Sequence, residues 1–132
     1  MRIFLADEDE ECIALIEAVA YQFPAIAELF YHIPNGGKRG KREAKKFKRM
    51  GVRKGMPDYC LPISRGIYHS CYIEMKRKED WKISKEQIDK IARLRAEGHY
   101  VDVAEGMDEA LIILHNYMIL KRNESLGVKF MT

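Results

Sequence analysis

The sequence lacks a long hydrophobic run, a cysteine framework and a strong net charge. No apolar stretch approaches the roughly 18 residues of a membrane-spanning helix, so we expect no membrane span. Its three cysteines, Cys12, Cys60 and Cys71, are widely spaced and form no Cys-x-x-Cys pair, which argues against a zinc ribbon or a redox centre. The formal net charge of +3 points by itself to no particular partner.

That small net charge hides an uneven distribution. From Lys38 to Lys54 ten Lys or Arg residues face one acid, Glu43, so this basic segment carries +9 and the rest of the chain −6. A dense basic stretch on a mildly acidic body is typical of proteins that bind a polyanion, although a solvated surface is the alternative. The residues that we expect to contact nucleic acid are Lys38, Arg39, Lys41, Arg42, Lys45, Lys46, Arg53 and Lys54.

The length of 132 residues, with 47% hydrophobic and 33% charged residues, fits one globular domain. We expect it to span residues 1–120, because residues 121–132 lack periodicity and are expected to form a frayed tail. The first residues turn acidic at Asp7, unlike a secretory signal peptide, so we expect a cytoplasmic protein, or one of the host cytoplasm if it is viral.

Capping residues and hydrophobic periodicity predict eight elements in the order α-β-α-β-β-α-β-α. Two capping boxes, Asp7-x-x-Glu10 and Ser84-x-x-Gln87, mark the two clearest helix starts. The expected helices cover residues 7–23, 42–50, 84–98 and 107–117, and the expected strands cover 29–33, 58–61, 67–76 and 99–104. This order predicts an α/β (α+β) domain with a small mixed β-sheet flanked by helices.

Three polar residues on two of these strands point to chemistry. Side chains two apart on a strand share a face, so Glu74 and Lys76 point together, and a hairpin would bring Asp58 close to Glu74. Two half-buried carboxylates repel each other unless a cation lies between them, and a hard divalent ion such as Mg²⁺ prefers oxygen ligands. Two acids, a metal, a lysine and a phosphate-attracting surface are what phosphodiester hydrolysis needs.

The first helix offers a further acid. At about 100° per residue, Glu8 projects onto the side of the apolar stripe, while Glu10, Glu11 and Glu17 project well away from it. Glu8 is therefore the acid expected to face inward, with Glu11 as the second choice.

At this point the motifs resemble a known family. Gly51-Val52-Arg53-Lys54-Gly55-Met56-Pro57-Asp58, Tyr72-Ile73-Glu74-Met75-Lys76 and Ser84-Lys85-Glu86-Gln87 are similar to the VRR-NUC domain, a branch of the PD-(D/E)xK nuclease superfamily. The run from His32 to Arg39 and the run from Gly98 to Val101 are similar to its stand-alone virus or phage members. The chain departs from the family pattern at Lys54, where the name-giving Val-Arg-Arg ends in arginine, and at Cys12, where a glutamine is usual.

The resemblance implies a restriction-endonuclease-like fold and a role for each matching residue. Asp58 and Glu74 would bind Mg²⁺ or Mn²⁺, with the backbone carbonyl of Met75 completing the metal shell. Lys76 would be the catalytic lysine, Glu8 the acid of the first helix, and Gln87 the glutamine of the following helix. Gln87 also completes the capping box with Ser84, so a purely structural role stays open.

The resemblance therefore implies a metal-dependent, structure-selective DNA endonuclease, and we expect a homodimer that cleaves branched DNA as Holliday junction resolvases do. Neither a membrane nor a small-molecule cofactor is expected. The alternatives are a non-catalytic nucleic-acid-binding module and a nuclease subunit that needs a partner protein.

Overall fold

The computed structural model describes residues 7–34, 40–77 and 81–122. Its elements follow the predicted order: α1 (Glu8–Gln22), β1 (Tyr31–His32), α2 (Lys41–Arg49), β2 (Tyr59–Leu61), β3 (Cys71–Lys76), α3 (Lys85–Ala96), β4 (Tyr100–Glu105) and α4 (Met107–Met118). Within these ranges no helix is long and apolar enough to cross a membrane.

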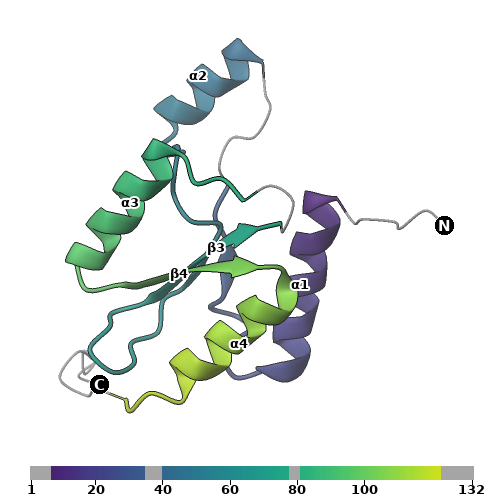
Figure 1. Ribbon diagram of the computed structural model, residues 1–132. Coiled ribbons are helices and arrows are strands. Elements are labelled where there is room, and N and C mark those ends of the chain that lie inside the picture. Colours follow the sequence, from purple (N-terminus) through teal and green to yellow (C-terminus); the bar gives the residue numbers. More distant parts are fainter. Residues whose placement is uncertain (1–6, 35–39, 78–80, 123–132) are drawn as a thin grey trace, which may run out of the picture.

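The four strands form one mixed sheet in the order β1-β2-β3-β4. The β1–β2 and β2–β3 pairs are antiparallel, and β3–β4 is parallel because α3 forms the crossover between them. Figure 1 shows α3 and α4 on opposite sides of β4. The predicted α+β class with a small mixed sheet is confirmed.

The core lies between one face of the sheet and the helices α1 and α4. Its largest fully buried side chains include Leu15 of α1, Leu61 of β2, Ile73 of β3 and Tyr117 of α4. Because side chains alternate along a strand, the neighbours of these strand residues point to the opposite face. That face carries the polar residues of the candidate site, and α3 packs on it along β4.

Both predicted capping boxes are present. The Asp7 side chain accepts a hydrogen bond from the Glu10 N–H at 2.8 Å, and the Ser84 hydroxyl accepts one from the Gln87 N–H at 3.2 Å. In each case the third residue of the helix also bonds back to the backbone of the capping residue. The two strongest sequence signals therefore fix where α1 and α3 begin.

Two predicted strands are too long. The first predicted strand, 29–33, shrinks to Tyr31–His32, because the N–H groups of Leu29 and Phe30 donate to the Ile26 carbonyl in a helical turn. The third, 67–76, begins only at Cys71, because Tyr68 bonds back to Arg65 and Ile67 is 77% exposed. In both places apolar composition suggested a strand where local hydrogen bonds make a turn.

The predicted tail, residues 121–132, lies largely outside the described residues. At its start the Lys121 carbonyl accepts a hydrogen bond from the Gly66 N–H at 2.8 Å. This bond attaches the end of α4 to the loop between β2 and β3.

Candidate active site

Asp58 and Glu74 lie opposite each other at the end of the β2–β3 pair. Tyr59 pairs with Ile73 in the antiparallel register, so the next residues beyond this pair, Asp58 on one strand and Glu74 on the other, face each other. The Asp58 Oδ2 atom accepts a hydrogen bond from the Met75 backbone N–H at 2.7 Å. This bond fixes the Asp58 carboxylate beside the strand that carries Glu74, as the hairpin argument predicted.

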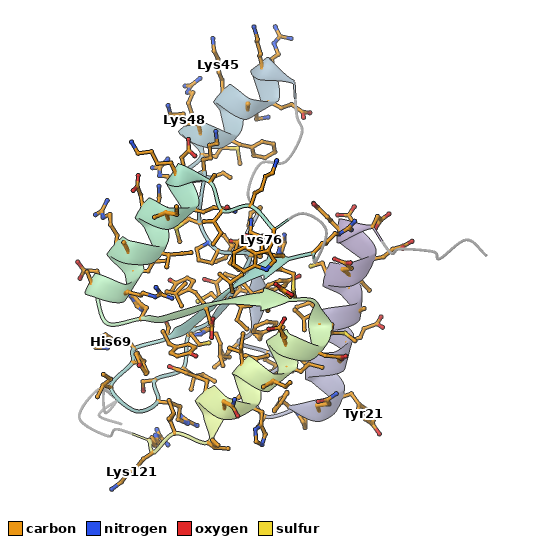
Figure 2. All side chains as sticks on the ribbon, in the orientation of Figure 1. Tyr21, Lys45, Lys48, His69, Lys76 and Lys121 are labelled. Atoms are coloured by element: carbon orange, nitrogen blue, oxygen red, sulfur yellow. The ribbon has the colours of Figure 1, made fainter. Side chains whose placement is uncertain are left out.

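Lys76 and Gln87 complete a polar network around Glu74. The Lys76 ammonium lies 3.6 Å from Glu74 Oε1 and donates a hydrogen bond to Gln87 Oε1 at 3.1 Å. The Gln87 amide nitrogen in turn donates to Glu74 Oε1 at 3.1 Å. Figure 2 shows Lys76 between α3 and α1. The network joins two residues on the same face of β3 to the first turn of α3.

Gln87 serves the helix cap and the network at once. Its Oε1 atom accepts from the Ser84 backbone N–H at 2.9 Å as well as from Lys76. The two readings of Gln87 from the sequence are therefore compatible, because the cap orients the amide whose nitrogen faces Glu74.

The ionised Glu74 carboxylate is energetically unfavourable in this position without a cation. The residue is 3% exposed, and its Oε2 atom is buried without a hydrogen-bond partner. Burial and then the neighbouring Asp58 carboxylate raise the pKa of Glu74 to about 8, against the opposing effect of Lys76. An unpartnered buried carboxylate oxygen beside a second carboxylate suits a hard divalent cation.

The two candidate acids of α1, Glu8 and Glu11, differ in their exposure and in their contacts. Glu8 is exposed, and its side chain makes no described hydrogen bond or ion pair with the cluster, whereas the half-buried Glu11 forms an ion pair with Arg77 at 3.4 Å. Among residues 7–34, 40–77 and 81–122, no three His, Cys, Asp or Glu side chains gather as a metal cluster. Glu11, the second choice from the sequence, is thus the α1 acid with a described contact next to Lys76.

Comparison with known proteins places this arrangement in a family. A family model for the VRR-NUC domain matches residues 7–108. The chain belongs to the VRR-NUC domain family. A solved structure titled "VRR_NUC domain protein" superposes with a TM-score of 0.76 at 30% identity, covering 91% of this chain and 94% of that one. No functionally curated protein matches. The resemblance seen in the motifs is confirmed, and with it a nuclease-type fold.

The basic segment of this VRR-NUC domain includes α2, which has no buried residue. Figure 1 shows α2 beyond the end of α3, away from the sheet, and in Figure 2 the labelled Lys45 and Lys48 extend outward from it. The predicted contacts Lys41, Arg42, Lys45 and Lys46 are all exposed on α2, while Lys38 and Arg39 lie outside the described residues.

The last part of the basic segment packs against α3. Lys54 forms an ion pair with Glu86 at 3.6 Å, and Arg53 donates to the Lys48 carbonyl at 3.1 Å. Gly55 has a φ of +87°, and a Cβ at this position would stand 2.6 Å from the Glu86 carbonyl. The sequence offers only the glycine between Lys54 and Pro57 as a signal of this close approach.

Sequence reasoning missed three residues on the same face of the sheet. Tyr31, Cys60 and Tyr72 pair across β1, β2 and β3. Tyr72 and Cys60 are each two residues from a member of the acidic pair, so strand alternation alone places them beside it.

Proposed function

We propose that this VRR-NUC domain is a metal-dependent, structure-selective DNA endonuclease that acts as a homodimer on branched DNA such as a Holliday junction. One observation carries the proposal. The buried Glu74 faces Asp58 with an unpartnered oxygen, within reach of a lysine that Gln87 holds in place. If Glu74 and Lys76 were only a solvent-facing ion pair, neither the burial of Glu74 nor the hydrogen bonds from Gln87 would be needed.

Mg²⁺ or Mn²⁺ suits the site, because such ions bind through one or two carboxylates together with substrate phosphate oxygens. Asp58 and Glu74 would hold the ion, with the Met75 carbonyl as the further ligand that the family resemblance implies. Glu11, whose carboxylate pairs with Arg77 next in sequence to Lys76, is the α1 acid that we propose to assist, and Glu8 is the alternative. When bound, such an ion lowers the pKa of water and neutralises phosphate charge.

The protein's own groups have distinct tasks in this proposal. Lys76 keeps a positive charge beside the pair and stabilises negative charge that develops on the scissile phosphate. Gln87 holds the Lys76 ammonium and Glu74 Oε1 at fixed positions through its amide. Because α3 and β3 are rigid elements, this geometry exists before the substrate binds.

DNA is the substrate that the charge distribution favours. The exposed lysines and arginines of α2 and the loop to Lys54 would contact backbone phosphates, and the segment leads directly into Asp58. Phosphate contacts position DNA without reading its sequence, so shape should decide which DNA is cleaved.

Two considerations support a homodimer. A chain of 132 residues has little surface with which to hold a branched substrate, and two copies would double the basic face. Apolar side chains also stay exposed on two helices, Ile13 on α1 and Ile112 on α4, and at Ile119 directly after α4. Such side chains suit an interface between copies of the chain.

The test is a cleavage assay on labelled four-way junction, flap and duplex DNA with Mg²⁺, Mn²⁺ or EDTA. The variants are Glu74→Ala and Lys76→Ala. The controls are Glu17→Ala and Lys121→Ala, which remove the same charges from exposed positions outside the network. We expect the wild type and the controls to cleave the branched DNA with a divalent ion, and neither site variant to do so.

No cleavage of any substrate by the wild type, or equal cleavage by Lys76→Ala, would contradict the enzyme. DNA binding that is equally tight in Mg²⁺ and in EDTA, without cleavage, would favour the alternative of a non-catalytic binding module. Light scattering tests the homodimer, and a mass near 15.4 kDa, that of one chain, would rule it out.

A further inference from the structure

An aromatic row crosses the open part of the sheet face that carries the candidate site. Tyr31 of β1 pairs with Cys60 of β2, which pairs with Tyr72 of β3, so the three side chains lie in one row on one face. Phe30 and Tyr59 stack on each other in the core on the opposite face.

The two tyrosines cover the cysteine. Cys60 is only 3% exposed, although among the helices α3 packs on β4 rather than β2. Cross-strand pairing places the side chains of Tyr31 and Tyr72 on either side of Cys60, and both hydroxyls lower the pKa of its thiol against the effect of burial. The Tyr31 side chain therefore lies beside Cys60 on the open face of the sheet.

Tyr31 and Tyr72 differ in how much of the ring is free. The Tyr72 ring packs edge-on against His99, with ring centroids 5.4 Å apart. Tyr31 is 50% exposed and makes no ring contact with another aromatic side chain among the described residues. Half of this side chain is thus exposed to solvent.

This free ring lies close to the acidic pair. Tyr72 precedes Glu74 by two residues, and Cys60 follows Asp58 by two, so the row runs parallel to the pair about 7 Å along the strands. Tyr31 lies two strands from Glu74, on the order of 10 Å away. A nucleotide close to the scissile phosphate would reach it.

We propose that the exposed Tyr31 ring, beside Cys60 on the open face of the sheet, is a stacking platform for an unpaired base of the substrate strand close to the cleaved phosphate. The proposal rests on the nuclease function above and narrows its substrate to DNA that is unpaired beside the cut. A base within a duplex has both faces covered by its neighbours, so only an unpaired or splayed base can stack on a protein ring.

The charge of the surroundings favours nucleic acid as the occupant. The row opens onto the face shared with Lys76, and the segment of +9 leads into the same site. An aromatic ring beside a basic groove binds single strands with little sequence preference. An apolar protein partner would instead meet the charged Lys76 and Glu74 on the same face.

The test compares a splayed-fork DNA with a fully paired duplex of the same sequence, using the purified full chain with Mg²⁺. Tyr31→Leu keeps an apolar cover over Cys60 without an aromatic ring, and Tyr31→Phe keeps the ring without the hydroxyl. Tyr21→Leu is the matched control, since Tyr21 is 87% exposed at the far end of α1 (Figure 2). Thermal melting verifies that each variant is folded.

We expect Tyr31→Leu to lower kcat/KM on the fork by roughly 5- to 100-fold, the effect of losing one stacked base. Cleavage of duplex should change by less than about twofold, and Tyr31→Phe and Tyr21→Leu should behave as wild type. Equal losses on both substrates, or no loss on the fork, would overturn the platform.

A binding measurement separates this inference from the nuclease proposal. A single-stranded oligonucleotide with 2-aminopurine, mixed with the protein in EDTA, should lose fluorescence when the base stacks on Tyr31. Quenching that disappears in Tyr31→Leu and persists in Tyr31→Phe supports the platform even if the wild type cleaves nothing. Quenching that is the same in all variants contradicts it, whatever the cleavage result.

Discussion

Lys76 donates a hydrogen bond to Gln87 Oε1 at 3.1 Å, and that oxygen also accepts the Ser84 backbone N–H that begins α3. The side chain that caps a helix therefore also holds the proposed catalytic lysine. Gln87→Ala should remove both contacts. Ser84→Ala should remove only the hydrogen bond that the serine hydroxyl accepts from the Gln87 N–H.

We expect Ser84→Ala to cost about 1 kcal/mol of unfolding free energy with little change in cleavage rate. Gln87→Ala should cost a similar amount and also lower the cleavage rate by about tenfold or more. Urea unfolding and single-turnover cleavage measure the two effects. If both variants lost activity in proportion to stability, Gln87 would be a helix cap alone.

Glu74 makes stability depend on pH in the metal-free protein. Burial and the Asp58 carboxylate raise the pKa of Glu74 from 4.5 to about 8, so the folded state binds this proton more tightly than the unfolded chain. Its contribution to stability is fully present below pH 4.5 and is lost as the pH rises through about 8.

In EDTA, Glu74→Gln should therefore be more stable than the wild type at about pH 9 and close to it at about pH 4. Mg²⁺ should restore part of the wild-type stability at high pH, because a bound cation favours the ionised pair. Thermal melts across this pH range provide the measurement. A wild-type melting temperature that rises between these pH values relative to Glu74→Gln would refute the argument.

The two acids of α1 can be separated by matched substitutions. Glu11 is half-buried in an ion pair with Arg77, directly after Lys76, whereas Glu8 is exposed. We expect Glu11→Gln to lower the cleavage rate by about tenfold or more, and Glu8→Gln to change it by less than about twofold. Cleavage titrated with Mg²⁺ and Mn²⁺ gives the measurement, and the reverse order of effects would support Glu8.

The exposed lysines of α2 should act through charge alone. Replacing Lys45 and Lys46 by alanine should weaken DNA binding equally for all sequences and reduce the slope of log K against log salt by about 0.9 for each lost phosphate contact. Fluorescence anisotropy at several salt concentrations measures this slope. An unchanged slope would show that α2 lies away from the DNA.

The sequence predicted most of this arrangement because its strongest signals are local. Two capping boxes set the starts of α1 and α3, and strand alternation with one hairpin was enough to pair Asp58 with Glu74. The same local reasoning failed at Ile67 and Leu29, where apolar residues lie in turns. An apolar residue indicates a strand only where the backbone around it can hydrogen-bond with a neighbouring strand.

Contacts between distant segments could not be predicted in the same way. The choice between Glu8 and Glu11 depends on where α1 ends up relative to Arg77, a distance set by core packing at Leu15 and Val19. The platform at Tyr31 depends on a two-residue strand whose register no sequence pattern specified. Tertiary packing decides both, and a single sequence does not encode it in any short window.

Gly55 and Gly51 provide a matched pair that tests how the basic segment is fixed to the site. Both have positive φ, +87° and +94°, so alanine is strained at either position. A Cβ at Gly51 would meet nothing within 4 Å, whereas one at Gly55 would stand 2.6 Å from the Glu86 backbone. Gly51→Ala should therefore cost about 1–2 kcal/mol, the backbone strain alone.

Gly55→Ala should cost more than Gly51→Ala, because the clash pushes the loop away from the start of α3. Since this loop leads through Pro57 into Asp58, while α3 carries Gln87, the shift should also lower the cleavage rate. Urea unfolding and cleavage kinetics of the two variants, side by side, isolate the clash from the strain. Equal losses in both variants would mean that the approach of Gly55 to Glu86 does not position the active site.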